Sequence, residues 1–579
     1  MKILLVYPYF LESRLHAEDI SVVPQGVYYI AALLNKHGYD AEILNWHAIN
    51  KAPHKIKAKL IETQPDVIGF SILHANRWGG IEIARIARQI NSEIKIVFGG
   101  IGASFLWKHF LVHFPEIDYV VIGEGEYTFL HLLNCLNDGD RDKIERIKGV
   151  AYRKGGRAVR NEDADAICDL DGLPVPARYF SYQHVSLTRG CAGKCNFCGS
   201  PQFWGRRVRF HSADYFVEQL QRLYAGGNRF FYVSDDTFTI DRQRVIEICH
   251  KIIEDKMEIN WTAISRVDMI DEDVLYWMRK AGCIQISYGV ESGAQKIRDF
   301  LNKNISDAQI CRAFELTQHY GIMARAYFIY GCPQESWQTI QQTLDLIDRI
   351  KPLSTIFYIL DLFPGTALYQ EYKIRFGLSD DIWLNRIEDI MYFETDPNLS
   401  RDLILAFGRK LRSGFYEKIP RFVEALKLID RQDLYPQHSD FFSRLAMTFE
   451  KGDYARIDEI PHKEQLAEKL FHRSLNYGPN ARAYLGLAIL QQKKGAYEES
   501  IRILLEGIAA FPDDENLHIC MAVNYMNRGE FNAALSYLLK WQHLREALNM
   551  IAKCYRALND MEKAEIYFQR YRELDKLPQ

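Results

Sequence analysis

Three cysteines within eight residues carry the clearest chemical signal of the chain. Cys191, Cys195 and Cys198 form a C-x-x-x-C-x-x-C pattern in SLTRGCAGKCNFCGSPQFWG, directly after a predicted strand. Thiolates are the usual ligands of iron-sulfur clusters, and a short loop with glycines lets three sulfurs converge on one cluster. Three ligands for a 4Fe-4S cluster leave one iron open, as in a catalytic zinc site with a free position.

Structural zinc is the alternative interpretation of these cysteines, with His211 as a distant fourth ligand. Zinc knuckles normally show two pairs of ligands, and no second C-x-x-C pair occurs in the chain. The pattern therefore favours a cluster with an open iron.

Residues 1–140 have the rhythm of alternating strands and helices. The apolar runs ILLVYP, AEILNW, DVIGFS, IKIVFGG and YVVIGEG are separated by amphipathic stretches. This pattern predicts a Rossmann-like, doubly wound α/β domain with a parallel sheet. Ligands of such folds bind beyond the carboxyl ends of the strands.

A second series of strands follows a polar segment. Residues 141–180 contain Pro174 and Pro176, which break regular structure, and we expect a linker there. Residues 181–375 then run through six strand-helix units, from HVSLTRG to TIFYILDLFPG. They predict a partial (β/α)6 barrel with its active site on the carboxyl-terminal rim, where the three cysteines would lie.

The remainder of the chain is predicted to be all-α. Residues 376–459 form a helical extension, and residues 460–579 repeat, with Gly495 and Gly529 lying 34 positions apart in matching segments. A period of 34 resembles tetratricopeptide repeats, which form a solenoid. Such solenoids present a concave face to a protein or peptide partner, although so short an array could instead only buttress the barrel.

Bulk composition excludes several classes of protein. A formal net charge of −3, with basic residues spread along 579 residues, argues against a nucleic-acid surface. We find no apolar stretch of about 18 residues that predicts a membrane-spanning segment. The start MKILLVYPYF predicts a strand rather than a signal peptide, and the eleven cysteines lack the density of a disulfide scaffold, so we expect a cytoplasmic protein.

Taken together, the motifs resemble the radical S-adenosylmethionine (SAM) superfamily. The cysteine pattern has an aromatic residue, Phe197, before its last cysteine, and FYVSDDTFT, YGVESGAQKIRDFLNK, DLFPGTALY and DLDGLPVPAR resemble members with an N-terminal cobalamin-type domain. The resemblance covers residues 1–375 and implies an enzyme that binds SAM at the open iron and cleaves it reductively to a 5′-deoxyadenosyl radical. An electron donor such as flavodoxin or ferredoxin is implied too.

The resemblance also implies residues for binding SAM. Asp235 and Asp236 would lie near the methionine amino group, Glu291 near the ribose or methionine, and Ser265 with Arg266 near the carboxylate. Asp236 could instead cap a helix, and Glu291 could pair with a core arginine. Cys332, in a Gly-Cys-Pro segment, is expected to be a buried small hydrophobic residue.

For cobalamin, the candidate residues lie after the strands of the first domain. Gly99, Gly100 and Gly102 open a helix and let the backbone approach a bulky ligand closely, while Gly123–Glu126 and Pro24-Gln25-Gly26 are further candidate turns. The D-x-H-x-x-G motif that supplies an axial histidine is missing. By resemblance, Arg77 or Trp78 would cover the lower face of the corrin, with His74 as an alternative ligand.

These features favour one function over two others. The preferred function is a cobalamin-dependent methyltransferase acting on an unactivated carbon. The first alternative is a cobalamin-independent radical SAM cyclase, coupling or rearrangement enzyme, and the second is a repeat-based adaptor with a structural cluster. Methylthiotransferases fit less well, because the first domain lacks three clustered cysteines.

Overall fold

The computed structural model describes residues 1–14, 23–49 and 52–574. The chain divides into two compact units, and each is described by itself. The first comprises Met1–Thr317 and Ala324–Arg412, and the second comprises Gln318–Met323 and Ser413–Gln579. The first unit therefore extends past the expected end of the barrel at residue 375 and includes part of the predicted helical extension.

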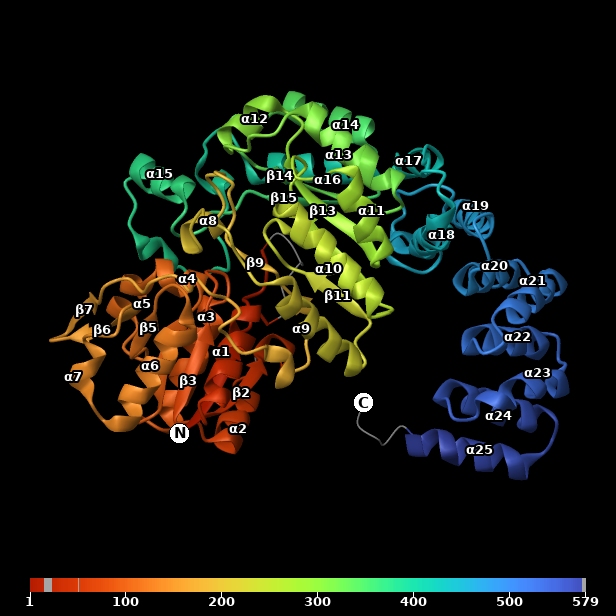
Figure 1. The fold of residues 1–579 in the computed structure, drawn as a ribbon, viewed down its shortest axis with the longest axis horizontal. Helices are drawn as coiled ribbons and strands as arrows, with labels where there is room; N and C mark the ends of the chain where they lie inside the picture. Colours follow the sequence, from red (N-terminus) through yellow and green to blue (C-terminus); the bar gives the residue numbers. More distant parts are fainter. Residues whose placement is uncertain (15–22, 50–51, 575–579) are drawn as a thin grey trace. The chain divides into compact units, whose positions relative to one another are not determined.

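The first sheet of unit 1 has seven strands in the order β2-β1-β3-β4-β5-β6-β7. Strands β1 to β5 pair in parallel, as the alternating strand-helix pattern predicts. The residues of β1, β3 and β4 are mostly buried and apolar, which is typical of a sheet covered on both sides, whereas the edge strand β2 also carries Asp40 and Glu42 (Figure 1). The strands are β1 (Lys2–Tyr7), β2 (Asp40–Asn45), β3 (Val67–Ser71), β4 (Lys95–Gly99), β5 (Tyr119–Val121), β6 (Val150–Lys154) and β7 (Arg157–Arg160).

Among the described residues, seven α-helices accompany this sheet. Helix α1 contacts α6, and α2 contacts α3, so the helices pack against one another as well as against the strands. Together they enclose a core of aliphatic and phenylalanine side chains. The helices are α1 (Gln25–Lys36), α2 (Pro53–Thr63), α3 (Arg77–Ile90), α4 (Ile101–Phe105), α5 (Trp107–His113), α6 (Gly125–Asp138) and α7 (Arg141–Ile144).

The segment expected to be a linker is partly sheet. Strands β6 and β7 form an antiparallel hairpin. Because β6 also pairs with β5, the hairpin extends the first sheet to Arg160. The hairpin turns at Gly155 and Gly156, which have φ values of 56° and 75° that favour glycine. The first domain is therefore longer than residues 1–140, and the irregular linker is confined to about twenty residues after the hairpin.

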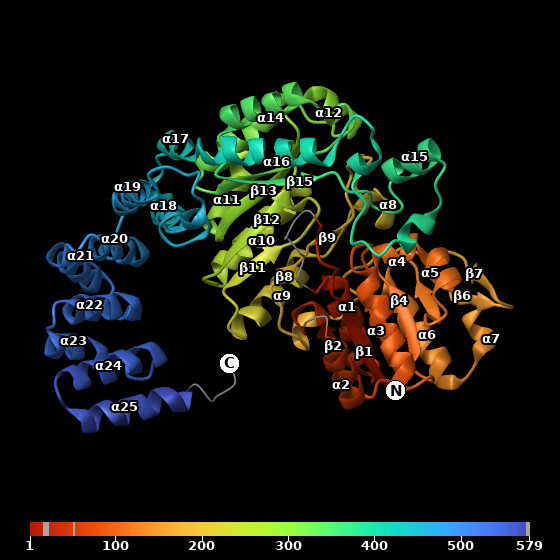
Figure 2. The same cartoon turned by 180° about the vertical axis from the view of Figure 1, so that it is seen from behind.

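The second sheet of unit 1 has six strands in the order β15-β14-β13-β12-β11-β8. Strands β8 and β15 form its two edges, so the sheet is open, as a partial barrel requires. Its strands can be followed in the view from behind in Figure 2. The strands are β8 (His184–Val185), β11 (Phe230–Val233), β12 (Asn260–Ser265), β13 (Cys283–Glu291), β14 (Met323–Tyr330) and β15 (Ser354–Ile359).

The remaining elements of unit 1 surround this second sheet. A short antiparallel pair, β9 (Thr188–Arg189) with β10 (Arg209–Phe210), brackets the cysteine loop. The helices are α8 (Ser200–Phe203), α9 (Ala213–Ala225), α10 (Arg242–Glu254), α11 (Glu272–Lys280), α12 (Gln295–Phe300), α13 (Asp307–His319), α14 (Trp337–Ile350), α15 (Ala367–Phe376) and α16 (Arg401–Tyr416), with a 3-10 turn η4 (Asp380–Leu384).

Unit 2 is a series of helices in which, from Tyr435 onward, each packs on the next (Figure 1). Asn480 and Asp514, the last residues of the segments YGPN and FPDD, cap two of them. Gly495 and Gly529, 34 residues apart, both have a left-handed backbone with φ of 73° and 78°. The helices are α17 (Ile419–Glu424), α18 (Tyr435–Glu450), α19 (Lys463–Leu475), α20 (Ala481–Lys493), α21 (Tyr497–Ala510), α22 (Glu515–Asn527), α23 (Phe531–Leu538), α24 (Arg545–Ala557) and α25 (Met561–Leu574).

The unit thus has the helical hairpins that the 34-residue period predicts, while its assignment to the tetratricopeptide family stays a prediction. Among the residues that the structure describes, no helix is long and apolar enough to cross a membrane.

Candidate active site

The three cysteines lie on one loop between β9 and α8, and all three are partly buried. The backbone N–H of Gly193 donates to the Cys191 sulfur at 3.4 Å. The loop is anchored at Asn196, whose side chain donates to the Phe300 carbonyl at 2.7 Å and whose own carbonyl accepts from Leu368 N–H at 3.0 Å. These contacts involve no metal, so the loop has a defined path of its own.

Burial and nearby negative groups disfavour free thiolates at Cys195 and Cys198. Burial is the main cause that raises the pKa of Cys198 to about 12, and the neighbouring Asp236, Cys195 and Cys191 add to it. The pKa of Cys195 is raised for the same main reason, against the nearby charges of Lys303 and Arg266. The thiols therefore lie close enough to interact, and a bound metal would have to displace their protons.

Asp235 and Asp236 follow β11, but only one of them faces the cysteines. Asp235 is buried and accepts hydrogen bonds from the Leu187 N–H and the Thr188 hydroxyl, so it holds the strand before the loop. Burial raises its pKa to about 7. Asp236 bonds the Ser200 hydroxyl and lies near Cys198, and so it does not cap a helix.

Of Ser265 and Arg266, at the end of β12, only the arginine lies near the cysteines. The Ser265 hydroxyl is buried against Thr239. Arg266 makes a two-point ion pair with Asp268, at 2.9 and 3.0 Å, and its charge acts on Cys191 and Cys195. The guanidinium therefore lies at the cysteine loop, where an anionic group of a ligand would be attracted.

Glu291, at the end of β13, is buried and pairs with a lysine rather than an arginine. Its Oε1 lies 2.8 Å from Lys303 Nζ, and Lys303 in turn lies near Cys195. Glu291 has a φ of 67°, a strained conformation for a residue other than glycine. Sequence reasoning missed Lys303, although its place in the segment DFLNKN beside the glutamate motif could have indicated it.

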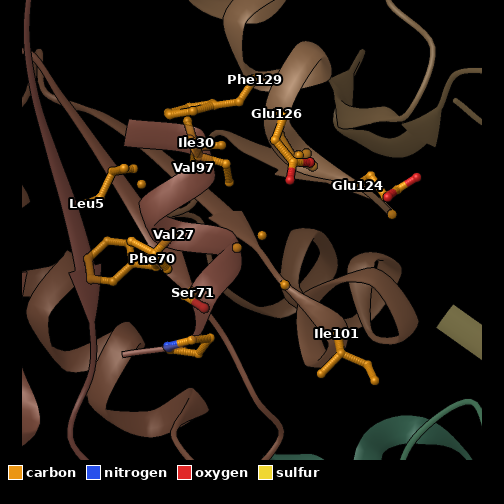
Figure 3. Close-up of a pocket in the computed structure, with 18 of the residues that line it drawn as sticks. Leu5, Val27, Ile30, Phe70, Ser71, Val97, Ile101, Glu124, Glu126 and Phe129 are labelled. Atoms are coloured by element: carbon orange, nitrogen blue, oxygen red, sulfur yellow. The ribbon is translucent and has the colours of Figure 1, made fainter. Parts of the chain in front are cut away.

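A cavity of about 240 Å³ opens at the carboxyl ends of the first sheet's parallel strands (Figure 3). Most of its wall is apolar, with two carboxylates on one side. A Cβ added at Gly26 or Gly123 would meet no atom within 4 Å, so these glycines leave the space free. The lining residues are Leu5, Val6, Pro24, Gly26, Val27, Ile30, Gly69, Phe70, Ser71, Leu73, Val97, Gly99, Gly100, Ile101, Val121, Gly123, Glu124, Gly125, Glu126, Phe129, Phe203 and Trp204.

Of the three glycines predicted to border cobalamin, two line the cavity and one allows close packing of the backbone. Gly99 and Gly100 line the cavity, and Gly100 has a φ of 90°. Gly102 is absent from the lining, and a Cβ there would lie 2.6 Å from the backbone of Leu73 and His74. Gly102 is therefore needed for close packing of α4 against the loop after β3.

The cysteine loop contributes to the wall of this cavity. Phe203 and Trp204, just after the loop, line it. Arg189, two residues before Cys191, donates to the carboxylates of Glu124 and Glu126, both at 2.6 Å. The buried Glu124 also accepts from Arg209 at 2.6 Å; burial opposes ionisation, but the two arginines outweigh it and lower the pKa of Glu124.

Arg77 and Trp78 are not among the residues that line the cavity. The buried guanidinium of Arg77 donates to the carbonyls of Trp383 and Glu388 among others, and Trp78 Nε1 donates to the Asn385 carbonyl at 2.9 Å. Both side chains thus hold the segment that contains η4. The loop residue in the cavity wall is Leu73.

His74 and His211, the alternative ligands for cobalt and for zinc, are both bonded to other side chains. His74 Nε2 lies 2.9 Å from Asp361 and 3.1 Å from Asp389. His211 bonds Tyr29 through Nε2 and Asp171 through Nδ1, so it is not a fourth ligand for zinc at the cysteines. Cys332 is fully buried, as expected.

Comparisons with known proteins agree with this arrangement. Residues 21–133 match the B12 binding domain family, and residues 185–347 match the radical SAM superfamily. An uncharacterized methyltransferase from Pyrococcus horikoshii is 31% identical over 391 residues, which cover 65% of this chain and 84% of the relative. An anaerobic magnesium-protoporphyrin IX monomethyl ester cyclase from Cereibacter sphaeroides is 27% identical, covering 68% of this chain and 67% of that protein.

A similar fold has been solved with cofactors. The radical SAM methyltransferase TsrM from Kitasatospora setae, with cobalamin and a 4Fe-4S cluster bound, has a TM-score of 0.55 at 18% identity, covering 65% of this chain and 78% of TsrM. That likeness concerns the fold. With the matched families and the Pyrococcus relative, it leads to one assignment: the chain belongs to the radical SAM superfamily, in the group whose members carry a B12-binding domain before the radical SAM domain.

Proposed function

We propose that this protein is a cobalamin-dependent radical SAM methyltransferase acting on an unactivated carbon. One observation carries the proposal: a single segment supplies both sites. Cys191, Cys195 and Cys198 lie between Arg189, which pairs with Glu124 and Glu126 of the cavity wall, and a short helix that brings Phe203 and Trp204 into that wall. A reaction that combines two cofactors requires such neighbouring sites.

The donor sets suit the two cofactors. Three thiols on an anchored loop match an iron-sulfur cluster with one open iron, and such a cluster supplies the electron that cleaves bound SAM. The apolar cavity with its glycine-rich wall matches a bulky organic ligand, and cobalamin would supply a carrier for the methyl group. We propose that the three cysteines hold the cluster and that Gly99 and Gly100 border the cobalamin.

The chain's own residues would position SAM. Asp236 lies near Cys198 and offers an acceptor for an amino group, whereas Arg266 near Cys191 and Cys195 offers a cation for a carboxylate. Glu291, fixed by Lys303, would contact the ribose or the methionine part. We place Asp235 and Ser265 behind these groups, as residues that position the strands.

The products distinguish this function from the main alternative. Anaerobically reconstituted protein with cobalamin, SAM and a chemical reductant should release 5′-deoxyadenosine together with a burst of about one S-adenosylhomocysteine per bound cobalamin. The burst should vanish when cobalamin is omitted. Deoxyadenosine without any S-adenosylhomocysteine would instead support a cyclase, an activity favoured by the 27% identity to the Cereibacter enzyme.

Partners of two kinds belong to this proposal. A low-potential protein such as flavodoxin or ferredoxin would reduce the cluster in the cytoplasm, where the eleven free cysteines would stay reduced. The hairpins of unit 2 would dock a protein or peptide, because stacked helical repeats commonly bind polypeptides. Deleting residues 479–579 should then leave 5′-deoxyadenosine formation unchanged while lowering turnover of a macromolecular substrate; loss of both activities would indicate a buttress.

A further inference from the structure

Two histidines of α5 and one aspartate of η4 gather in unit 1, outside the site described above. His109 and His113 are four residues apart, so they lie on one face of the helix. His113 Nε2 lies 3.0 Å from Asp381 Oδ1. One ligand atom from each of the three residues lies within 4.8 Å of the other two.

His109 is the unusual member of this cluster. It is only 4% exposed, and neither ring nitrogen has a hydrogen-bond partner among the residues that the structure describes. Its ring packs edge-on against Phe110 and Phe114, which satisfies its apolar surface but not its nitrogens. A buried polar group without a partner destabilises the fold, so a ligand for this imidazole would remove that penalty.

We propose that His109, His113 and Asp381 bind a zinc ion. Two imidazoles and one carboxylate are a known ligand set for zinc with one position left open. Calcium and magnesium favour all-oxygen sites, and zinc binds nitrogen ligands more tightly than ferrous iron does. His113 and Asp381 have side chains that are 31% and 64% exposed, so the ion could enter from solvent and keep a water.

The other buried histidine cluster of unit 1 makes a useful contrast. His74 also lies between two carboxylates, Asp361 and Asp389, but there the imidazole nitrogen is already paired with both. Only the His109 cluster combines several ligands with a buried nitrogen that has no partner among the described residues. The ion would join α5 to η4, which are 268 residues apart in the sequence, and would fix the segment that packs Trp383 into the core.

Metal analysis of the full-length protein tests this site. Protein dialysed anaerobically against EDTA and then given zinc chloride should bind about one zinc beyond any at the cysteine loop, with a rise in melting temperature. The variants His113→Ala and Asp381→Ala should bind at least tenfold more weakly and lose that rise. His54→Ala removes an exposed histidine elsewhere and should behave as wild type.

Zinc-edge X-ray absorption separates this site from zinc trapped by the cysteines. The proposal predicts nitrogen and oxygen neighbours at about 2.0–2.1 Å and no sulfur at about 2.3 Å for the zinc lost in the variants. Sulfur neighbours alone, unchanged affinity in both variants, iron bound in place of zinc, or no binding would each overturn it. None of these results depends on SAM cleavage.

Discussion

Arg189 Nη1 lies 2.6 Å from Glu124 Oε1, and this ion pair joins the cysteine loop to the wall of the cavity. Both side chains are less than 10% exposed, and the same guanidinium also reaches Glu126. The pKa of Arg189 is raised because these two carboxylates outweigh the effect of burial. The two candidate cofactor sites are therefore coupled through one buried cation.

The first prediction concerns this cation. Replacing Arg189 by Lys should destabilise unit 1 by about 3–5 kcal/mol, because a lysine cannot engage both carboxylates at once and leaves one buried charge poorly paired. Thermal unfolding of the apo-protein measures the effect. Arg178→Lys is the matched control, since its pair with Glu218 is half exposed, and it should not change the melting temperature. Equal behaviour of the two variants would show that the Arg189 bridge does not stabilise the unit.

The second prediction is a pH dependence at His74. Burial alone would lower the pKa of His74, but the charge and hydrogen bond of Asp361, with those of Asp389, raise it from 6.5 to about 9. Because the folded pKa lies above the unfolded one, the stabilisation is complete below pH 6.5 and is lost as the pH rises through about 9.

We expect the melting temperature of the wild type to fall over that window and to fall less in His74→Gln. Arg77 is also close to the two aspartates, but it stays charged throughout this window, since its pKa is lowered only to about 10. Parallel pH curves for the two proteins would mean that His74 does not titrate as described.

The third prediction concerns a substitution that would fill the cavity. Gly26 lies in the first turn of α1, where a Cβ meets no atom within 4 Å, so Gly26→Leu should fold and project into the space. Cobalamin bound per chain should drop well below one, measured by absorbance after anaerobic reconstitution, while iron content stays constant. Gly26→Ala adds only one methyl group and should retain more cobalamin. Full binding in the leucine variant would place cobalamin elsewhere.

The fourth prediction concerns the lower face of the corrin. The described cavity is lined by Leu73 and by no histidine, and His74 is held by Asp361 and Asp389. Electron paramagnetic resonance of the reduced cob(II)alamin form should therefore show no splitting from an axial nitrogen. The spectrum should be the same in His74→Ala. Nitrogen splitting in the wild type that disappears in this variant would identify His74 as a ligand.

Periodicity in the sequence predicted the framework, because buried parallel strands are almost continuously apolar. The hairpin of β6 and β7 was missed, since VAYRK and RAVR are short, carry several charged residues and read as a polar linker, although only β7 is an edge strand. Asp236 and Arg266 lie near the cysteines, while Asp235 and Ser265 are bonded away from them. Both aspartates and Arg266 lie beyond the ends of β11 and β12, where the alternation of side chains along a strand gives no guide.

Long-range contacts were beyond sequence reasoning. Arg77 and Trp78 bond backbone carbonyls some 300 positions away, and no local pattern indicates such partners. His109 and His113 do form a local H-x-x-x-H pattern. Their aspartate, however, comes from a distant turn that only the fold brings near.

The most direct measurement is SAM cleavage by the cysteine loop. Wild-type protein and the triple variant Cys191→Ala, Cys195→Ala, Cys198→Ala should be reconstituted anaerobically, reduced with dithionite and given SAM, and 5′-deoxyadenosine should be quantified. We predict formation by the wild type and none by the variant, which should keep its fold because Asn196 anchors the loop without metal. Equal 5′-deoxyadenosine from the folded triple variant would contradict the assignment of these cysteines to the catalytic cluster.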